Sequence, residues 1–90
     1  MPYYVYILES QKDKEWYTGC TSDLKRRFIQ HNKSESFPMR FRKPFRLIYY
    51  EMSLNSKDAF AREEYLKSGM GKRYIKNRLK FFFNEYEKNL

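Results

Sequence analysis

Hydrophobic and polar positions along the chain form a few short runs, and each run predicts one element. Residues 3–8 are rich in β-branched and aromatic side chains, and the polar stretch 10–15 separates them from the apolar residues 16–18. Two such runs joined by a short polar segment predict a β-hairpin. Residues 45–51 return to strand character after the basic, proline-flanked stretch 32–44, which predicts a loop.

Helix signals follow the strand segments. Thr21, Ser22 and Asp23 offer side-chain oxygens that can cap a first helix, which is expected from about residue 23 to residue 32. Asn55 or Ser56 can cap a second helix, which is expected to end near residue 68.

The C-terminal third combines two glycines with a periodic apolar pattern. Gly69 and Gly71 favour a helix stop followed by a turn. A last helix is expected soon after, with one face packed on the sheet, because apolar residues recur there at helical spacing, namely Ile75, Leu79, Phe82 and Tyr86. The predicted order is β-β-α-β-α-α, an α+β fold in which helices flank a small three-stranded antiparallel sheet. Residues 1–90 are expected to form one domain.

Composition changes this picture mainly through charge. Nineteen Lys and Arg against eleven Asp and Glu leave a net charge of +8, which favours an anionic partner, and nucleic acid is the first candidate. DNA is expected, with RNA left open, and a solvated basic surface without a specific ligand is the alternative. Aromatic residues are 20% of the chain, so most of its rings are expected in the core.

Cysteine usage and hydropathy bear on the compartment. Cys20 is the only cysteine, so the chain can form neither an internal disulfide nor a multi-cysteine zinc site, and a reducing cytoplasm fits. The longest apolar run, residues 3–8, is too short to span a bilayer. We expect no signal peptide and no membrane anchor.

One acidic residue stands out on the second predicted helix. Projection at about 100° per residue places Glu63 on the same stripe as four apolar residues, Ala59, Phe60, Leu66 and Met70. A carboxylate on an apolar face needs a cation, a hydrogen bond or a metal. Glu63 is therefore a candidate ligand for Mg²⁺ (or Mn²⁺), and an ion pair with Arg27 or a nearby lysine is the alternative. The lack of an acidic cluster argues against a two-metal site.

Arg27 and His31 lie one turn apart on the first predicted helix. A guanidinium suits the binding of a scissile phosphate and of the charge that develops on it, whereas an ordinary surface pair with Asp23 is the alternative. A single His beside an apolar edge is more often structural.

These residues occur in a distinctive order. Tyr4-Val5-Tyr6 is followed by Tyr17-Thr18-Gly19, then by Arg27 and His31 ten and fourteen residues after Tyr17, and finally by Glu63. This arrangement resembles the GIY-YIG nuclease family from about residue 3 to residue 73. It is most similar to the small standalone branch that is related to the catalytic domain of the bacterial excision-repair nuclease subunit. Tyr4 stands where the family name carries Gly, and Thr18 replaces its middle Ile.

The resemblance implies that one of the two tyrosines activates water. We assign Tyr6 as the general base, with His31 accepting or orienting its proton and Tyr17 positioning water or phosphate; the reverse assignment stays open. A phenol has a reference pKa of about 10, so it needs nearby positive charge, which Arg27 and a metal can provide. Gly19 is expected to end the second strand and allow a turn and a close approach, or to be a plain turn glycine.

The function implied is a metal-dependent endonuclease that hydrolyses DNA phosphodiester bonds, selective for DNA structure and linked to repair or recombination. The alternative is a non-catalytic or partner-dependent nucleic-acid-binding module, and a protein partner or a homodimer stays open. Asn77 lies near the separation from Glu63 at which the family often carries Asn.

Nucleic acid is expected along two basic edges, one in and after the central loop and one near the last helix. The candidate phosphate-binding residues are Lys33, Arg40, Arg42, Lys43, Arg46, Lys72, Arg73 and Lys76. Phe37, Phe41 and Trp16 are candidates for stacking on unpaired bases, although each is more typical of a core or loop anchor.

Overall fold

The computed structural model describes residues 1–34 and 39–88, with the side chains at 39–40 and 86–88 outside the description. Along the chain the elements are β1 (Tyr3–Ser10), β2 (Trp16–Thr21), α1 (Leu24–Lys33), α2 (Met39–Arg42), β3 (Phe45–Ser53), α3 (Ser56–Lys67), α4 (Gly69–Arg78) and α5 (Lys80–Lys88).

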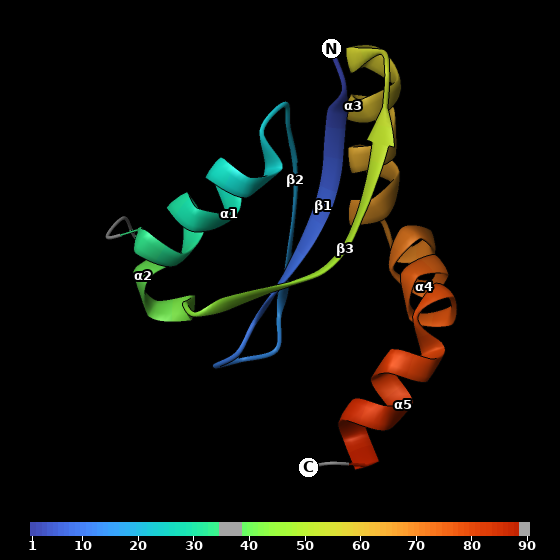
Figure 1. Cartoon of the computed structure of the whole chain (residues 1–90). Helices are drawn as coiled ribbons and strands as arrows, with labels where there is room; N and C mark the ends of the chain where they lie inside the picture. Colours follow the sequence, from blue (N-terminus) through green and yellow to red (C-terminus); the bar gives the residue numbers. More distant parts are fainter. Residues whose placement is uncertain (35–38, 89–90) are drawn as a thin grey trace.

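The three strands form one antiparallel sheet, as predicted, and their order in it is β2-β1-β3. In this register Tyr6 of the central strand lies opposite Gly19 of β2 and Tyr50 of β3. Helices α1 and α2 lie on one side of the sheet, and α3 and α4 lie on the other (Figure 1). The predicted α+β class is confirmed.

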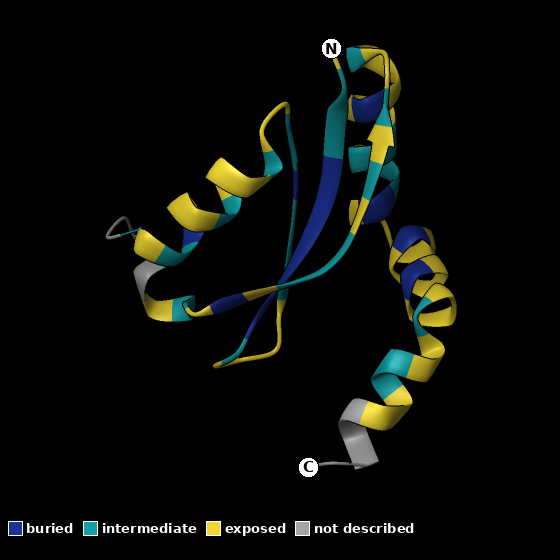
Figure 2. Cartoon of the chain, viewed as in Figure 1, coloured by how far each residue is buried: buried dark blue, intermediate teal, exposed yellow. Residues whose placement is uncertain are grey.

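The central strand β1 is buried from Val5 to Ser10, which Figure 2 shows as its dark blue stretch. Side chains alternate between the two faces of a strand, so neighbouring residues enter different cores. Val5 and Ile7 pack with Ala59, Leu66 and Ile75 of α3 and α4. On the other face, aromatic and aliphatic side chains form a second cluster, namely Tyr6, Leu8 and Phe45 with Leu24 and Phe28 of α1 packed against them.

The predicted helix caps are present. The Asp23 carboxylate accepts a hydrogen bond from the Arg26 amide at 3.1 Å and begins α1. The Asn55 side chain accepts one from the Lys57 amide at 2.8 Å and begins α3. Each cap satisfies an amide of the first turn that has no partner within its own helix.

Gly19 does not end the second strand, and the predicted turn there is wrong. Strand β2 continues to Thr21, and no glycine among the described residues has a positive φ. A Cβ built on Gly19 would lie 2.5 Å from Tyr6 Oη and 2.6 Å from Tyr6 Cζ. The expected close approach is therefore present, and it is made by the Tyr6 ring.

The second and last helices also differ from their predictions. Helix α3 ends at Lys67, and Ser68 caps α4 directly by accepting from the Gly71 amide at 3.1 Å, so the glycines lie in the first turn of α4. Gly71 is buried where a Cβ would collide with the backbone of Tyr65. The predicted single last helix is two helices, α4 and α5, because the chain breaks again at Leu79.

Two of the four apolar residues predicted on one stripe of the second helix are not buried. Ala59 and Leu66 are buried, whereas the side chains of Phe60 and Met70 are exposed. Met70 lies after the helix break at Ser68, so a projection that treats residues 59–70 as one continuous helix places its side chain on the wrong face. The predicted loop 32–44 holds the short helix α2, and the side chain of Tyr86 is outside the described residues. None of the described helices is long and apolar enough to cross a membrane.

Candidate active site

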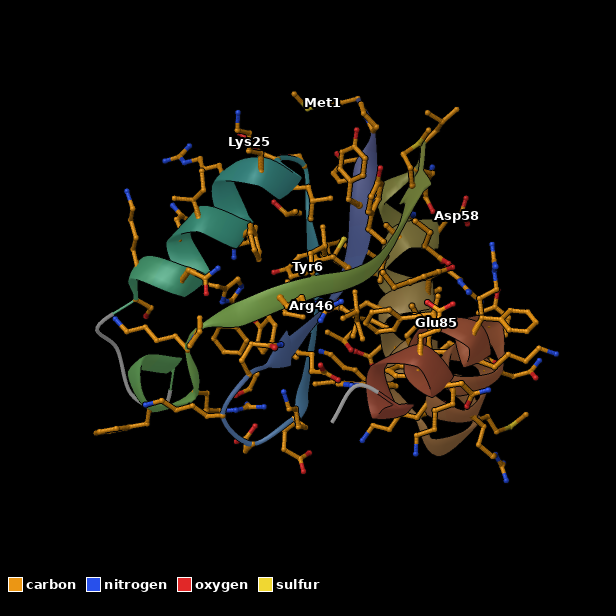
Figure 3. The ribbon with its side chains drawn as sticks, turned by 60° about the horizontal axis from the view of Figure 1, so that its bottom comes forward. Met1, Tyr6, Lys25, Arg46, Asp58 and Glu85 are labelled. Carbon is orange, nitrogen blue, oxygen red and sulfur yellow. The ribbon has the colours of Figure 1, made fainter. Side chains whose placement is uncertain are left out.

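Two phenols and an imidazole meet on the α1 face of the sheet. Tyr6 is buried on β1 between the α1 layer and the α3–α5 layer, whereas Lys25 lies on the outer side of α1 (Figure 3). Tyr6 Oη and His31 Nε2 are 3.1 Å apart and share a hydrogen bond. The Tyr17 ring lies 4.7 Å from the His31 ring, centroid to centroid. These three side chains come from β1, β2 and α1, so the fold brings them together.

Arg27 joins this group from the preceding turn of α1. Its guanidinium acts on both rings: at Tyr6 its charge opposes part of the rise in pKa that burial causes, and at His31 it adds to the lowering of the pKa by burial. Arg27 is exposed and lines a hollow of about 260 Å³ together with Thr21 and Gln30. The carboxylate of Asp23 is engaged with the Arg26 amide as the helix cap.

Glu63 reaches the site from the opposite layer. Its side chain is 18% exposed, and Oε2 lies 3.0 Å from Lys67 Nζ, so it has the lysine partner that was the alternative to a metal. Its negative charge also raises the pKa of Tyr6 and of Cys20. Helix α3, which carries Glu63, packs against β1 and against the edge strand β2, the two strands that carry Tyr6 and Tyr17.

Lys67 is a site residue that the sequence reasoning did not name. It lies four residues after Glu63, and this helical spacing is a signal that could have found it. Hydrogen bonding to Glu63 raises the pKa of Lys67, and the nearby Tyr17 contributes in the same direction. Lys67 is therefore a cation beside Glu63.

Burial decides the protonation of the Tyr6–His31 pair. Burial raises the pKa of Tyr6 above its usual value, with Tyr17 adding to the shift, and the opposing effect of Arg27 is smaller. Arg27 alone therefore does not offset burial at Tyr6, and the expected contribution of a metal to the ionisation of this phenol stays a prediction. Burial and then Arg27 lower the pKa of His31, so its imidazole is neutral at neutral pH and can accept a proton.

The site offers a metal ion a single carboxylate, so it suits an ion that needs few protein ligands. Within residues 1–34 and 39–88, no three His, Cys, Asp or Glu side chains lie close enough together to hold an ion. Glu63 offers one carboxylate, and its negative charge adds to burial in raising the pKa of Tyr6 and of Cys20. Mg²⁺ accepts such a site, because it keeps several waters and takes substrate phosphate oxygens as its other ligands.

The predicted basic residues are spread over two regions. Lys33 is exposed at the end of α1, Arg46 is exposed on β3, and Lys43 is half-buried. Arg42 is half-buried, and its Nε lies 3.5 Å from Asp13 Oδ2. The second region is exposed on α4 and comprises Lys72, Arg73 and Lys76, with Asn77 exposed beside them.

The aromatic candidates for base stacking differ in their surroundings. Phe41 is exposed on α2, while Trp16 stacks on Phe83 of α5, with ring centroids 5.7 Å apart. The side chain of Arg40, and Phe37 as a whole, lie outside the described residues.

Comparisons with known proteins identify relatives of this chain. A UPF0213 protein of Clostridium perfringens (strain 13) is 42% identical over 65 residues, which cover 71% of this chain and 69% of the relative. A UPF0213 protein of Streptococcus pyogenes (serotype M5) is 46% identical over 57 residues, covering 62% of this chain and 60% of the relative.

A solved structure has the same fold. The solution NMR structure of a UPF0213 protein from Bacillus halodurans is 38% identical, with a TM-score of 0.53, and the match covers 83% of this chain and 82% of that chain. The family model described as the GIY-YIG catalytic domain matches residues 2–80, which include every side chain of the site described above. The chain therefore belongs to the GIY-YIG nuclease family.

Proposed function

We propose that this protein is a metal-dependent endonuclease that hydrolyses DNA phosphodiester bonds. The observation that carries the proposal is the buried hydrogen bond between Tyr6 and His31, with Arg27 and Glu63 both acting electrostatically on the same phenol. The pairing of an acid–base group with a phosphate-binding cation and a metal-binding carboxylate is what hydrolysis of a phosphodiester requires.

The proton of the attacking water leaves through a relay. The raised pKa of Tyr6 makes a standing phenolate costly, so Tyr6 Oη takes the water proton while its own proton passes to His31 Nε2. This requires the imidazole tautomer that carries its hydrogen on Nδ1. The lowered pKa of His31 keeps the ring neutral and ready to accept. Tyr17, against the His31 ring, positions the water or the phosphate.

Groups from the α1 layer and from the α3 layer would stabilise the negative charge of the phosphate. Arg27 holds the equatorial oxygens through charge-assisted hydrogen bonds, and these strengthen as negative charge develops. Glu63 would hold Mg²⁺ (or Mn²⁺), which when bound supplies Lewis-acid stabilisation of the leaving oxygen. Lys67 is paired with Glu63 at 3.0 Å in the free chain and can turn to a phosphate oxygen when that carboxylate binds a metal.

DNA binds along the exposed basic residues, which favour phosphates without reading sequence. A net charge of +8 supports an anionic polymer as substrate. Selectivity for DNA structure, a role in repair or recombination and a cytoplasmic location complete the proposal.

Two matched variants test the reaction. Wild type, Glu63→Gln and the exposed neighbour Glu64→Gln are incubated with labelled branched, nicked, duplex and single-stranded DNA, and with RNA, in Mg²⁺, Mn²⁺ or EDTA. Cleavage by wild type and Glu64→Gln in metal, with none by Glu63→Gln, is the expected result. Undiminished cutting by Glu63→Gln removes the proposed role of this carboxylate.

The second candidate is a nucleic-acid-binding module that needs a protein partner for cleavage or does not cleave. The Glu63–Lys67 ion pair favours it, because the carboxylate already has a cation in the free chain. DNA binding by all three proteins without cutting by any of them would support this candidate.

A further inference from the structure

The side chain of Asn32 ties the last turn of α1 to the first residue of β3. Its Nδ2 donates a hydrogen bond to the Phe45 carbonyl oxygen at 3.2 Å, and its Oδ1 accepts one from the Phe45 amide at 2.5 Å. One half-buried amide thus satisfies both backbone groups of a residue 13 positions away in the sequence. Because β3 is an edge strand, Asn32 takes the place that a further strand would occupy beside Phe45.

The ring of Phe45 forms one wall around the imidazole of His31. Phe45 is buried in the same cluster as Tyr6, and its ring meets the His31 ring edge-on, with centroids 6.0 Å apart and planes at 66°. The Tyr17 ring lies 4.7 Å from the imidazole. Side chains from β1, β2 and β3 therefore surround the ring, and the direction in which Nε2 points depends on where Phe45 lies.

The chain just before Phe45 is attached to β1 and to the hairpin. Ser10 Oγ donates a hydrogen bond to the Arg42 carbonyl oxygen at 2.6 Å, and the Gln11 amide donates one to the Pro44 carbonyl oxygen at 2.9 Å. The bonds of Asn32 attach the next residue, Phe45, to the helix that carries His31. The wall is thereby fixed with respect to both the phenol on β1 and the imidazole on α1.

A hydrogen-bonded Asn near a helix end can serve stability alone, but the neighbours of Asn32 favour a second role. Asn32 follows His31 directly in the last turn of α1, so a shift of this turn relative to β3 moves both side chains. The residue that Asn32 binds is also the one whose ring contacts His31. Close-packed interiors transmit such shifts, and a displacement of about 1 Å at a reacting group can cost about 100-fold in rate.

We infer that Asn32 is a positioning residue for His31: by fixing Phe45, its amide holds the imidazole Nε2 toward the Tyr6 hydroxyl. The relay from Tyr6 to Nε2 needs one ring orientation and one neutral tautomer, with the hydrogen on Nδ1. Without the amide of Asn32, the ring can turn and exchange between tautomers. The inference rests on the proposed function where it concerns cleavage, whereas the state of the imidazole is a property of the free protein.

His31 is the only histidine of the chain, so an untagged protein gives a single set of imidazole signals. Long-range ¹H–¹⁵N correlation spectra are recorded at neutral pH, without DNA or metal, for wild type, Asn32→Ala and Asn55→Ala. Asn55→Ala is the matched control, because it also removes a side-chain hydrogen bond to the backbone, at 2.8 Å, but on α3. We expect one dominant neutral tautomer in wild type and in the control, and a mixture in Asn32→Ala. Wild-type imidazole signals in Asn32→Ala overturn the inference.

Cleavage should report the same change in the reaction. The single-turnover rate of Asn32→Ala, per folded molecule, should fall by about 10–100-fold, because the proton acceptor is misplaced. DNA affinity should stay at the wild-type value, since the polar atoms of Asn32 are engaged with the backbone of Phe45. Asn55→Ala should cleave as wild type does. An unchanged cleavage rate in Asn32→Ala overturns the role in positioning.

A second variant decides the question if Asn32→Ala does not fold. Phe45→Leu keeps the backbone groups that Asn32 binds and removes the ring that contacts His31, so it should give a similar mixture of tautomers. In the double variant the effect should be no larger than in either single variant, because Asn32 acts through Phe45. An unchanged imidazole in Phe45→Leu, or additive effects in the double variant, overturns the inference.

The spectra need no substrate, so they separate this inference from the proposed function. An altered imidazole in Asn32→Ala, without cleavage by wild type, removes the proposed nuclease activity and leaves Asn32 as the residue that positions His31. Metal-dependent cleavage by wild type, with the same imidazole signals in both proteins, removes only the inference about Asn32.

Discussion

The two faces of the sheet are both covered by helices, yet they are built from different side chains. On the α3 face, Val5 and Ile7 meet Ala59, Leu66 and Ile75, and this cluster is fully apolar. On the α1 face the core includes Tyr6, whose hydroxyl contacts buried His31. One strand, β1, supplies both faces through simple alternation.

This difference implies that the α3 face contributes mainly to stability, whereas the α1 face carries the candidate catalytic groups. On the α3 face, apolar burial stabilises the cluster around Val5 and Ile7, and hydrogen bonds from Arg62 to Glu51 lie on the same face. The α1 face must satisfy buried polar atoms, so its side chains are held in one arrangement by hydrogen bonding and by the space beside Gly19. Substitutions on the two faces should therefore affect different measurements.

The largest expected effect is on the α1 face, from Tyr6→Phe. Removal of the hydroxyl ends the relay to His31, and DNA cleavage should fall by about 10²–10⁴-fold. The free energy of unfolding should change by only about 1 kcal/mol, because one hydrogen bond is lost. Single-turnover cleavage and chemical denaturation measure the two quantities. If Tyr17→Phe is the more damaging variant, the roles of the two phenols are reversed.

Leu66→Ala tests the opposite face. The loss of a fully buried side chain should lower the free energy of unfolding by about 2–5 kcal/mol and leave the cleavage rate per folded molecule unchanged. Phe60→Ala on the same helix is the control, since Phe60 is exposed and its change should stay within about 0.5 kcal/mol. Equal destabilisation by both variants would mean that α3 packs in another phase.

Gly19→Ala perturbs the α1 face without removing a functional atom. The new methyl group would lie 2.5 Å from Tyr6 Oη, so the buried ring, which is hydrogen-bonded to His31, must shift. We expect a destabilisation of about 1–3 kcal/mol from overpacking and a cleavage loss smaller than that of Tyr6→Phe. Gly69→Ala is the matched control, because no atom lies within 4 Å of its Cβ position. Wild-type cleavage by Gly19→Ala would show that Tyr6 tolerates the displacement.

The smallest expected effect is the pH dependence that His31 confers. Burial lowers the pKa of His31 in the folded state below the usual 6.5, so below pH 6.5 the unfolded chain takes up more protons. Stability from this group is complete above pH 6.5 and is lost as pH falls toward the lowered value. The difference in unfolding free energy between wild type and His31→Gln should follow that course. A difference independent of pH between neutrality and mild acid would contradict the assigned pKa shift.

The fold was largely predictable because its signals are local. The hairpin, the third strand and the caps at Asp23 and Asn55 depend on runs and side-chain oxygens within a few residues. The breaks at Ser68 and Leu79 interrupt a continuous apolar pattern, so a single helical phase carried across them misplaced Met70.

The residues of the candidate site could be named from the sequence, but their burial and electrostatic surroundings could not. The order of Tyr6, Tyr17, Arg27, His31 and Glu63 is visible in one dimension. Burial outweighs Arg27 at Tyr6, and Gly19 makes room for a ring on the neighbouring strand; both depend on contacts between segments far apart in the sequence.

The placement of Tyr6 on the central strand also determines how the site moves. Strand β1 forms hydrogen-bond ladders on both sides, and its side chains enter both cores. The backbone of Tyr6 can open to solvent only when both helix layers separate, so its amide should exchange with deuterium at the rate of global unfolding. Lys67, at the exposed end of α3, can exchange by local fraying. The strand that carries the phenol is thereby among the last segments to open, and motion that admits the proposed substrate falls to charged residues at the exposed helix end, such as Lys67.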